Sequence, residues 1–251
     1  MTAFASEIDA TYETISATCT HCGELNTYNR VSDLGTCEAI DSLEVKCQRE
    51  ACGKPFRVTG DLINPAHEML LYECRSFLDR KRFMQCVLSV SQAYEVFFNH
   101  FMYVEFLYRP AARDADAING YPKVSQALLR RLKRFSFEHL RRTFLTIVAE
   151  GKRAASLADA EQLIASLNGR PEVPRDAIEA VVDPQLKALL IGVRDTSVNQ
   201  LRNRVIHQEA YRPTFLEASG AFEEACVLIC GLGGKLRLRG DANWYINGGE
   251  R

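Results

Sequence analysis

The sequence predicts a mainly α protein in which a helical domain follows a small cysteine-rich module. From Pro65 onward, apolar residues recur at three- and four-residue steps, the period of an amphipathic helix. Before that point, five of the nine cysteines crowd into residues 19–52, among few large apolar side chains. We therefore expect a metal-stabilised module with a short lead at 1–62, a helical domain at 63–232 and a Gly-rich tail at 233–251.

The composition limits the classes of function. Of the 251 residues, 47% are hydrophobic and 25% are charged, which is typical of a globular protein. The formal net charge of −1 gives no whole-chain attraction to nucleic acid. An RNA-binding surface would therefore have to come from local clusters of Lys and Arg.

Membrane and secretory signals are not apparent in the sequence. No stretch of about 18 residues is free of charge, so we expect no membrane span. The acidic N-terminus lacks a basic start followed by an apolar run, so we expect no secretory signal. The resulting expectation is a cytoplasmic protein whose cysteines are reduced thiols.

The first 60 residues are expected to hold a short helix and short strands. Residues 1–16 are weakly patterned and are predicted as a leading helix. β-prone pieces follow at 44–46 and 56–59, between Cys, Gly, Asn and Asp residues. This segment has too few large apolar residues to fold around a core of its own.

Seven helices are predicted after Pro65, with breakers between them. Arg109-Pro110 should end the second helix, and residues 113–122 should form a loop. Gly231 should begin a C-cap and turn. A basic, hairpin-like piece is expected at 235–239. The predicted helices cover 68–78, 81–108, 124–133, 137–150, 157–167, 184–207 and 213–230.

The N-terminal cysteines form two pairs with the spacing of a metal site. Cys19 and Cys22 are followed by a glycine, and so are Cys47 and Cys52. Each pair fits a tight turn that aims two thiolates at one ion, because glycine lets the backbone turn sharply. Four soft ligands in a core-poor segment favour one structural Zn²⁺ per chain.

Two alternatives bear on this zinc site. The second pair has four intervening residues instead of two, and Cys37 or His21 could substitute, although neither improves the spacing. The other alternative is a set of scattered free cysteines. With four protein ligands the zinc ion has no open position for chemistry, so we expect a structural site. The segment resembles a zinc ribbon, which is a docking module for protein or nucleic acid.

The run Arg202-Asn203-Arg204-Val205-Ile206-His207 combines residue types that suit RNA cleavage without a metal. On a helix, the side chains of Asn203 and His207 point about 40° apart, whereas those of Arg202 and His207 point about 140° apart. The long side chain of Arg202 must therefore bend around the helix toward His207, or Arg202 acts at a dimer interface. Val205 and Ile206 are expected to face the core beside them.

Such cleavage needs a base for the ribose 2′-OH, an acid for the leaving 5′-oxygen and a cation for the phosphorane. Histidine transfers protons near neutral pH, and arginine binds phosphate oxygens through a planar fork. Asparagine can hold a phosphate or orient the imidazole. One helix supplies one histidine, so two copies at a twofold axis would supply both acid and base.

Arg202, Asn203 and His207, placed late in a helical stretch, resemble the motif of the HEPN superfamily. The resemblance covers about residues 65–230. It implies a bundle of about four to five helices that dimerises, with both motifs in one cleft, and RNA cleavage that leaves a 2′,3′-cyclic phosphate. Many such proteins are toxins or antiphage effectors.

Some HEPN families also carry a polar residue on the opening helix, facing the cleft. Glu95 matches that position, with Asn99 one turn later; the alternative is that Glu95 is a solvated helix residue. The order of zinc ribbon and HEPN domain is similar to that of ring-activated zinc-finger RNases of bacterial antiphage defence. That resemblance implies a phage protein as trigger, sensed by the zinc ribbon, and RNA as substrate.

Other features leave their alternatives open. The basic run at 130–134, with Phe135 and Phe137 nearby, is either a phosphate track or a solvated helix face. His100 and His139 are interpreted as core-edge residues of amphipathic helices. The Gly231-to-Lys235 segment lacks the Ser or Thr and the spacing of a phosphate-binding loop. For the whole protein, the rival hypothesis is a non-catalytic HEPN and zinc-ribbon adaptor.

Overall fold

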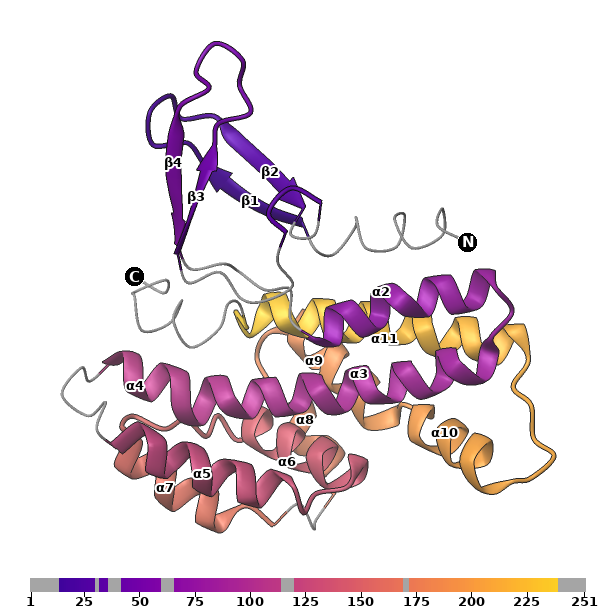
Figure 1. The fold of residues 1–251 in the computed structure, drawn as a ribbon. Coiled ribbons are helices and arrows are strands. Elements are labelled where there is room, and N and C mark those ends of the chain that lie inside the picture. Colours follow the sequence, from indigo (N-terminus) through magenta and orange to yellow (C-terminus); the bar gives the residue numbers. More distant parts are fainter. Residues whose placement is uncertain are drawn as a thin grey trace. The chain divides into compact units, whose positions relative to one another are not determined.

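The structure, a computed structural model, describes residues 14–29, 32–35, 42–59, 66–113, 120–168 and 172–238. The described part is mainly helical, as the sequence predicts, and its strands all lie near the N-terminus. The chain divides into two compact units, Met1–Asn64 and Pro65–Arg251, which are described separately (Figure 1).

The first unit contains two antiparallel hairpins. Strand β1 (Thr14–Thr18) pairs with β2 (Leu25–Asn29), and β3 (Ser42–Lys46) pairs with β4 (Pro55–Thr59). The strands expected at 44–46 and 56–59 are thus confirmed. The leading helix is wrong for residues 14–16, which lie in β1, because β-branched residues there favour a paired strand. Residues 1–13 lie outside the described part.

A minimal core and one glutamine hold the hairpins together. Gln48 donates its backbone N–H to Asn26 Oδ1 at 2.6 Å and its side-chain amide to the carbonyl of Thr27 at 2.6 Å. The Tyr28 hydroxyl donates to the carbonyl of Lys46 at 2.7 Å. The buried apolar residues include Tyr28, Val45, Phe56, Val58, Cys19 and Cys47. Two of these are cysteines, which agrees with a segment too small to depend on apolar burial alone.

The second unit is built around one long helix, α3 (Phe83–Tyr103), whose aromatic face is buried. In Figure 1, α3 runs the length of this unit between α2 and α11 on one side and α5, α6 and α7 on the other. The remaining helices are α2 (Ala66–Asp79), α4 (Arg109–Arg113), α5 (Tyr121–Leu132), α6 (Phe137–Ala149), α7 (Leu157–Ser166), α8 (Arg175–Glu179), α9 (Pro184–Asp195), α10 (Val198–His207) and α11 (Phe215–Lys235).

The expected helix end at Arg109-Pro110 is wrong. The chain continues from α3 through a π-helical turn, η1 (Val104–Tyr108), into α4. In this wide turn the N–H of Arg109 reaches back five residues to the carbonyl of Val104. A proline inside a helix lacks an N–H and clashes with the carbonyl four residues back. The π turn just before Pro110 gives the room that a regular helix would not.

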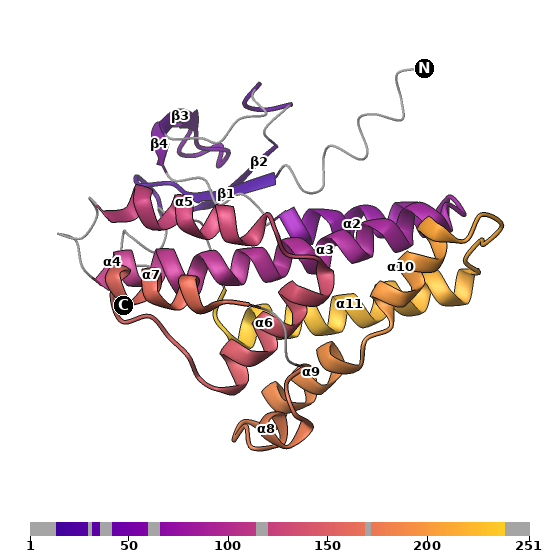
Figure 2. The same ribbon diagram turned by 90° about the horizontal axis from the view of Figure 1, so that it is seen from below.

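The single helix expected over 184–207 is two helices, α9 and α10, with a break that Figure 2 shows. Thr196 between them is extended, and its hydroxyl accepts the N–H of Val198 at 3.3 Å. The same hydroxyl donates to Glu224 on α11. The break therefore depends on a partner distant in sequence, and the local pattern could not reveal it.

The glycines after Cys230 continue a helix instead of ending it. Helix α11 runs to Lys235, and the N–H of Leu238 then bonds back to the carbonyl of Gly233 at 2.9 Å. A Cβ at Gly231 would approach Leu189 Cδ2 to 2.8 Å, so glycine allows α9 to pack closely on α11. The expected turn at Gly231 and hairpin at 235–238 are wrong, and residue 239 lies outside the described part.

Two smaller boundaries also differ. Helix α5 begins at Tyr121, inside the expected loop, with Pro122 in its first turn, where a missing N–H costs nothing. Helix α8 was not expected from the pattern. Among the described residues, no helix is both long and apolar enough to cross a membrane.

Candidate functional site

The first unit brings its four paired cysteines to one point. The sulfur atoms of Cys19, Cys22, Cys47 and Cys52 all lie within 4.8 Å of one another. Cys19 Sγ lies 3.9 Å from Cys52 Sγ, and Cys22 Sγ lies 3.7 Å from Cys47 Sγ. A tetrahedral zinc with Zn–S bonds of about 2.3 Å places its sulfurs about 3.8 Å apart. The cluster therefore has the geometry to hold a metal ion.

The turns around the cysteines fit this role. Gly23 and Gly53 have positive φ angles of 73° and 53°, the conformation expected where the chain reverses after each pair. The backbone N–H of His21 points at Cys19 Sγ, 3.4 Å away. Burial raises the pKa of the Cys19 thiol, but the N–H groups of His21 and Cys22 outweigh it and lower that pKa to about 7. These hydrogen bonds favour the thiolate form of Cys19. The backbone of Glu24 lowers the pKa of the Cys22 thiol, but burial and the other three cysteines outweigh it and raise that pKa to about 11.

The substitutes considered for this site do not join it. The Nε2 atom of His21 lies 2.9 Å from the carbonyl of Pro55 and is engaged there. Cys37 lies outside the described residues. The four-residue gap of the second pair is accommodated by a turn in which the N–H groups of Cys52 and Gly53 both bond to the carbonyl of Arg49.

In the second unit, the strip of residues 202–207 occupies the last part of α10. Arg202 and Asn203 are half-buried, and Arg202 Nη1 donates to Asn203 Oδ1 at 3.1 Å. His207, the last residue of the helix, is exposed, and its side chain forms no hydrogen bond with the described residues. Val205 faces the core as expected, but Ile206 does not, because it is 46% exposed. Adjacent helical residues point about 100° apart, and here that rotation carries Ile206 out of the core.

Glu95 of α3 lies within electrostatic reach of this strip. Burial raises the pKa of its carboxyl group, and the positive charge of Arg202 acts in the opposite direction. The side chain of Glu95 is half-buried, so it is not the fully solvated helix residue of the alternative interpretation. Asn99, one turn later, has a buried Oδ1 atom without a hydrogen bond among the described residues. The structure thus places the charge of Arg202 within electrostatic range of Glu95, with Asn203 hydrogen-bonded to Arg202 and His207 one turn beyond Asn203.

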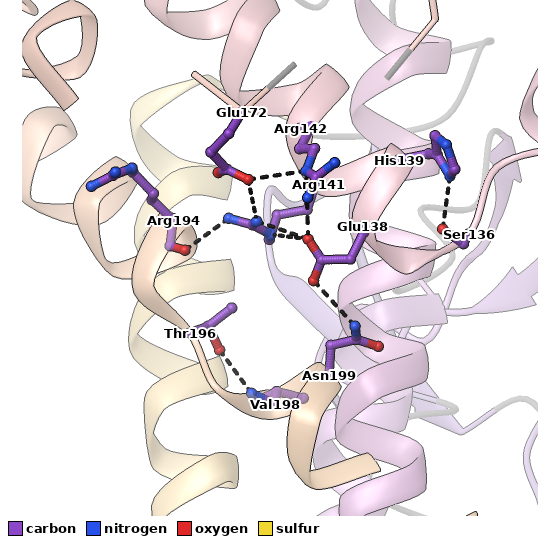
Figure 3. A network of polar contacts seen from close by, with 10 residues as sticks. All are labelled: Ser136, Glu138, His139, Arg141, Arg142, Glu172, Arg194, Thr196, Val198 and Asn199. Atoms are coloured by element: carbon purple, nitrogen blue, oxygen red, sulfur yellow. Dashed lines mark hydrogen bonds and ion pairs between the residues drawn. The ribbon is translucent and has the colours of Figure 1, made fainter. Parts of the chain in front are cut away.

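A buried arginine network fixes the start of α10 (Figure 3). Arg141 of α6 is 6% exposed and bonds both Glu138 and Glu172 at 2.8 Å. Its Nη1 also donates to the carbonyl of Arg194 at 2.7 Å, at the end of α9. The other oxygen of Glu138 accepts the side-chain amide of Asn199 at 3.1 Å. Because Asn199 lies one turn before Asn203, this network sets the direction of the strip.

A second network holds the break before α10. The carboxylate of Glu224 on α11 accepts hydrogen bonds from the hydroxyls of Thr196 and of the buried Tyr94 on α3. Burial raises the pKa of Tyr94, and the nearby carboxylate adds to the increase. The phenol therefore remains a neutral donor near neutral pH.

The end of α10 is anchored to the start of α11. Arg204 pairs with Glu217 at 3.4 Å, and its guanidinium lies 4.7 Å from the centre of the Tyr211 ring. Glu217 also closes a capping box with Thr214 and accepts the Tyr211 hydroxyl at 2.5 Å. The Thr214 N–H and these other donors lower the pKa of Glu217 to about 2. This end of the strip is therefore held by charge and by a helix cap.

Sequence reasoning missed the residues that position the strip. Glu138, Arg141 and Asn199 lie on helices that were expected, but nothing local marks them as partners. It also missed the contact between the core-edge His100 and the buried His67, whose ring centres lie 5.6 Å apart. His139, the other histidine interpreted as a core-edge residue, is half-buried and bonds Ser136 at 2.8 Å.

Comparisons with protein-family models, with curated proteins and with solved structures find no match to this chain.

Proposed function

We propose that this protein is a metal-independent endoribonuclease of the HEPN type, with a zinc ribbon as its sensing or docking module. One observation carries the proposal: Arg202 and Asn203 lie against each other on α10, within reach of Glu95, and His207 is exposed one turn later. The residue types match the needs of RNA cleavage, and two polar networks hold the helix that bears them.

The proposed roles follow from the chemistry. An imidazole of His207 removes the proton of the ribose 2′-OH, whose oxygen attacks the adjacent phosphorus. A second imidazole donates a proton to the leaving 5′-oxygen, so the products are a 2′,3′-cyclic phosphate and a 5′-hydroxyl. Arg202 stabilises the negative charge of the phosphorane, and Asn203 positions the phosphate. Glu95, which lies within electrostatic range of Arg202, is the polar residue that the opening helix contributes to the site.

The second imidazole requires a second copy of the chain. His207 is the only histidine on α10, so a complete acid–base pair forms only in a homodimer. Three exposed apolar side chains near the strip support a dimer interface there. They are those of Ile206, Phe215 and Leu216, and Leu216 is 78% exposed. Exposed apolar side chains beside an incomplete site are best explained by a partner that covers them.

The zinc ribbon is proposed to regulate the ribonuclease activity. The four-cysteine cluster holds one structural Zn²⁺, and the zinc ribbon receives a trigger such as a phage protein. An unregulated ribonuclease would damage its own host, so the protein acts as a toxin or antiphage effector that stays idle until triggered. Expression alone should then be less toxic than expression with the trigger.

The test is RNA cleavage by the full chain in magnesium-free buffer, with mass analysis of the RNA ends. His207→Ala should reduce the rate by about 10²- to 10⁴-fold, the usual contribution of an acid–base group. Gln208→Ala, at the exposed neighbour, should cleave like wild type. In an equal mixture that exchanges subunits, His207→Ala should also lower the activity per wild-type chain. Cleavage retained by His207→Ala would end the proposal.

The second candidate is a non-catalytic adaptor in which both units bind protein. The exposed apolar residues Phe215 and Leu216 favour it as much as they favour a dimer. Total RNA that stays intact after overexpression with and without infection would favour the adaptor.

A further inference from the structure

A positively charged groove lies between α5 and α7, on elements that carry none of the proposed catalytic residues. It encloses about 250 Å³. Arg130 and Arg131 of α5, with Arg134 in the turn after it, line one wall, and Glu161 and Ile164 of α7 line the other. Three arginines in one groove are notable in a chain whose formal net charge is −1.

The arginine charges in this groove are not neutralised by ion pairs. Arg130 and Arg134 are exposed and form no ion pair with the described residues. Glu161 is already paired, because its carboxylate lies 2.8 Å from Lys123 Nζ. Arg131 donates to the carbonyl of Leu167, but its Nε is buried without a hydrogen bond among the described residues. The groove therefore presents a positive field and unused N–H donors to an anion.

The spacing of these arginines suits a chain of phosphates better than a single anion. Arg130 and Arg131 lie in the last turn of α5, Arg134 lies in the turn that follows the helix, and all three line the same groove. Guanidinium groups bind phosphate oxygens through paired N–H donors. A row of such groups along one wall of a groove follows a polymer backbone, whereas a single phosphate needs donors that converge.

An aromatic surface continues the groove at the turn between α5 and α6. The ring of Phe135 is stacked on His139, with centres 5.7 Å apart and planes at 29°. The guanidinium of Arg131 lies 5.8 Å from the centre of the Phe135 ring. Both rings are half-buried, so part of this surface remains open. Aromatic rings beside a basic groove are the means by which proteins bind single-stranded nucleic acid.

This aromatic surface adjoins the helix that bears the strip. His139 is next to Glu138, and Glu138 accepts the side-chain amide of Asn199 on α10 at 3.1 Å (Figure 3). The start of α6 is thus linked to the groove through Phe135, which contacts Arg131, and to the start of α10 through Glu138.

We propose that the α5–α7 groove binds the phosphodiester backbone of single-stranded RNA and leads the strand past Phe135 and His139 toward α10. This inference rests on the proposed function for its ligand, since both require RNA. It adds an RNA-binding site that is separate from the catalytic strip.

The test is RNA binding by the full chain with His207→Ala, which should slow cleavage, at several salt concentrations. Fluorescence anisotropy of a labelled single-stranded RNA reports the affinity. Replacing Arg130 and Arg134 together by glutamine should weaken binding by about tenfold or more and reduce the salt slope by about 1.4, or about 0.7 for each lost phosphate contact. The matched control is Arg75→Gln with Arg175→Gln, which removes the same charge from exposed arginines paired with Asp79 and Glu179.

Different results of this experiment would overturn the RNA-binding groove and the nuclease activity. Unchanged binding by the Arg130 and Arg134 double variant, or an equal effect of the control, would overturn the groove and leave the nuclease standing. Competition by inorganic tripolyphosphate at the same affinity as RNA would also overturn it, because the ligand would then be a small polyanion. A wild-type chain that binds RNA through the groove without cleaving it would overturn the nuclease alone.

Discussion

At the scale of single residues, His67 is the described histidine whose pKa departs most from its ordinary value. It is 3% exposed, its ring meets the edge of Phe97 at 5.3 Å, and its Nδ1 has no hydrogen bond among the described residues. Burial, and to a lesser extent the charge of His100, lowers the pKa of His67 to about 3. Burial also lowers the pKa of His100. The fold therefore holds both rings in their neutral forms.

This burial predicts that the second unit loses stability in mild acid. In the unfolded chain His67 binds a proton below about pH 6.5, whereas in the folded chain it stays neutral down to about pH 3. Stability is therefore present above pH 6.5 and is lost as the pH falls. Between pH 7 and 5 we expect a loss of about 2 kcal/mol from this residue.

Denaturant unfolding at pH 7, 6 and 5 measures this effect. His67→Phe, which keeps an aromatic ring against Phe97, should show a smaller loss of stability in acid than wild type. His207→Ala, at an exposed histidine, serves as the control and should follow the wild-type profile. Parallel pH profiles for wild type and His67→Phe would contradict the prediction.

Sequence patterns revealed those site residues whose partners are close in the chain. The cysteine pairs were recognisable because each lies in one turn, and the order Arg202, Asn203, His207 is readable along one helix. The Arg141 network was not, because its partners come from residues 138, 172, 194 and, through Glu138, 199. Arginines and glutamates on helices are usually solvated, and only the packed fold shows that this arginine is buried.

At the scale of elements, the position of α10 depends on tertiary contacts more than on its own sequence. The periodic pattern predicted one helix over 184–207, and no glycine or proline marks the break at 196–197. Hydrogen bonds from Thr196 to Glu224 and from Asn199 to Glu138 give α10 its direction. Gly231 is the opposite case. Glycine is typical of helix ends, but Gly231 lies inside α11 and permits close packing against α9.

The Asn199–Glu138 contact predicts a positioning effect on the proposed reaction. Asn199→Ala removes the hydrogen bond to Glu138 and should loosen α10 at its start. We expect kcat for RNA cleavage to fall by about tenfold with little change in KM, because transition-state alignment is lost more than binding. The free energy of unfolding should fall by about 1 to 2 kcal/mol.

Two further variants distinguish positioning from general damage. Gln200→Ala, at the exposed neighbour on the same helix, should leave kcat and stability unchanged. Asn199→Asp combined with Glu138→Gln reverses the donor and acceptor and should restore part of kcat. If kcat of Asn199→Ala follows only the fraction of folded protein, the contact has a structural role alone.

At the scale of the whole molecule, the two units draw their stability from different sources. The second unit has a continuous apolar core that includes the rings of Tyr94, Phe97, Phe98, Phe101 and Phe144. The core of the first unit has few members, and two of them are cysteines of the metal cluster. Apolar burial can therefore sustain the second unit, whereas in the first an ion held by the four cysteines would join the two hairpins.

Removal of the metal should accordingly unfold the first unit and spare the second. A chelator that strips the ion leaves four thiols about 4 Å apart with little apolar core to hold them, so residues 14–59 should lose their dispersed amide NMR signals. The helical signal from residues 66–238 should persist, and added Zn²⁺ should restore the lost signals at one ion per chain.

Variants make the same test without a chelator. Cys52→Ser removes one of the four sulfurs and should abolish stoichiometric zinc, because a three-sulfur site loses the closed tetrahedral set. Cys230→Ser, at an exposed thiol of α11, should keep it. Dispersed signals from residues 14–59 that survive complete metal removal would mean that the hairpins fold on hydrogen bonds such as those of Gln48. Loss of helix in the metal-free chain would instead mean that the second unit depends on the first.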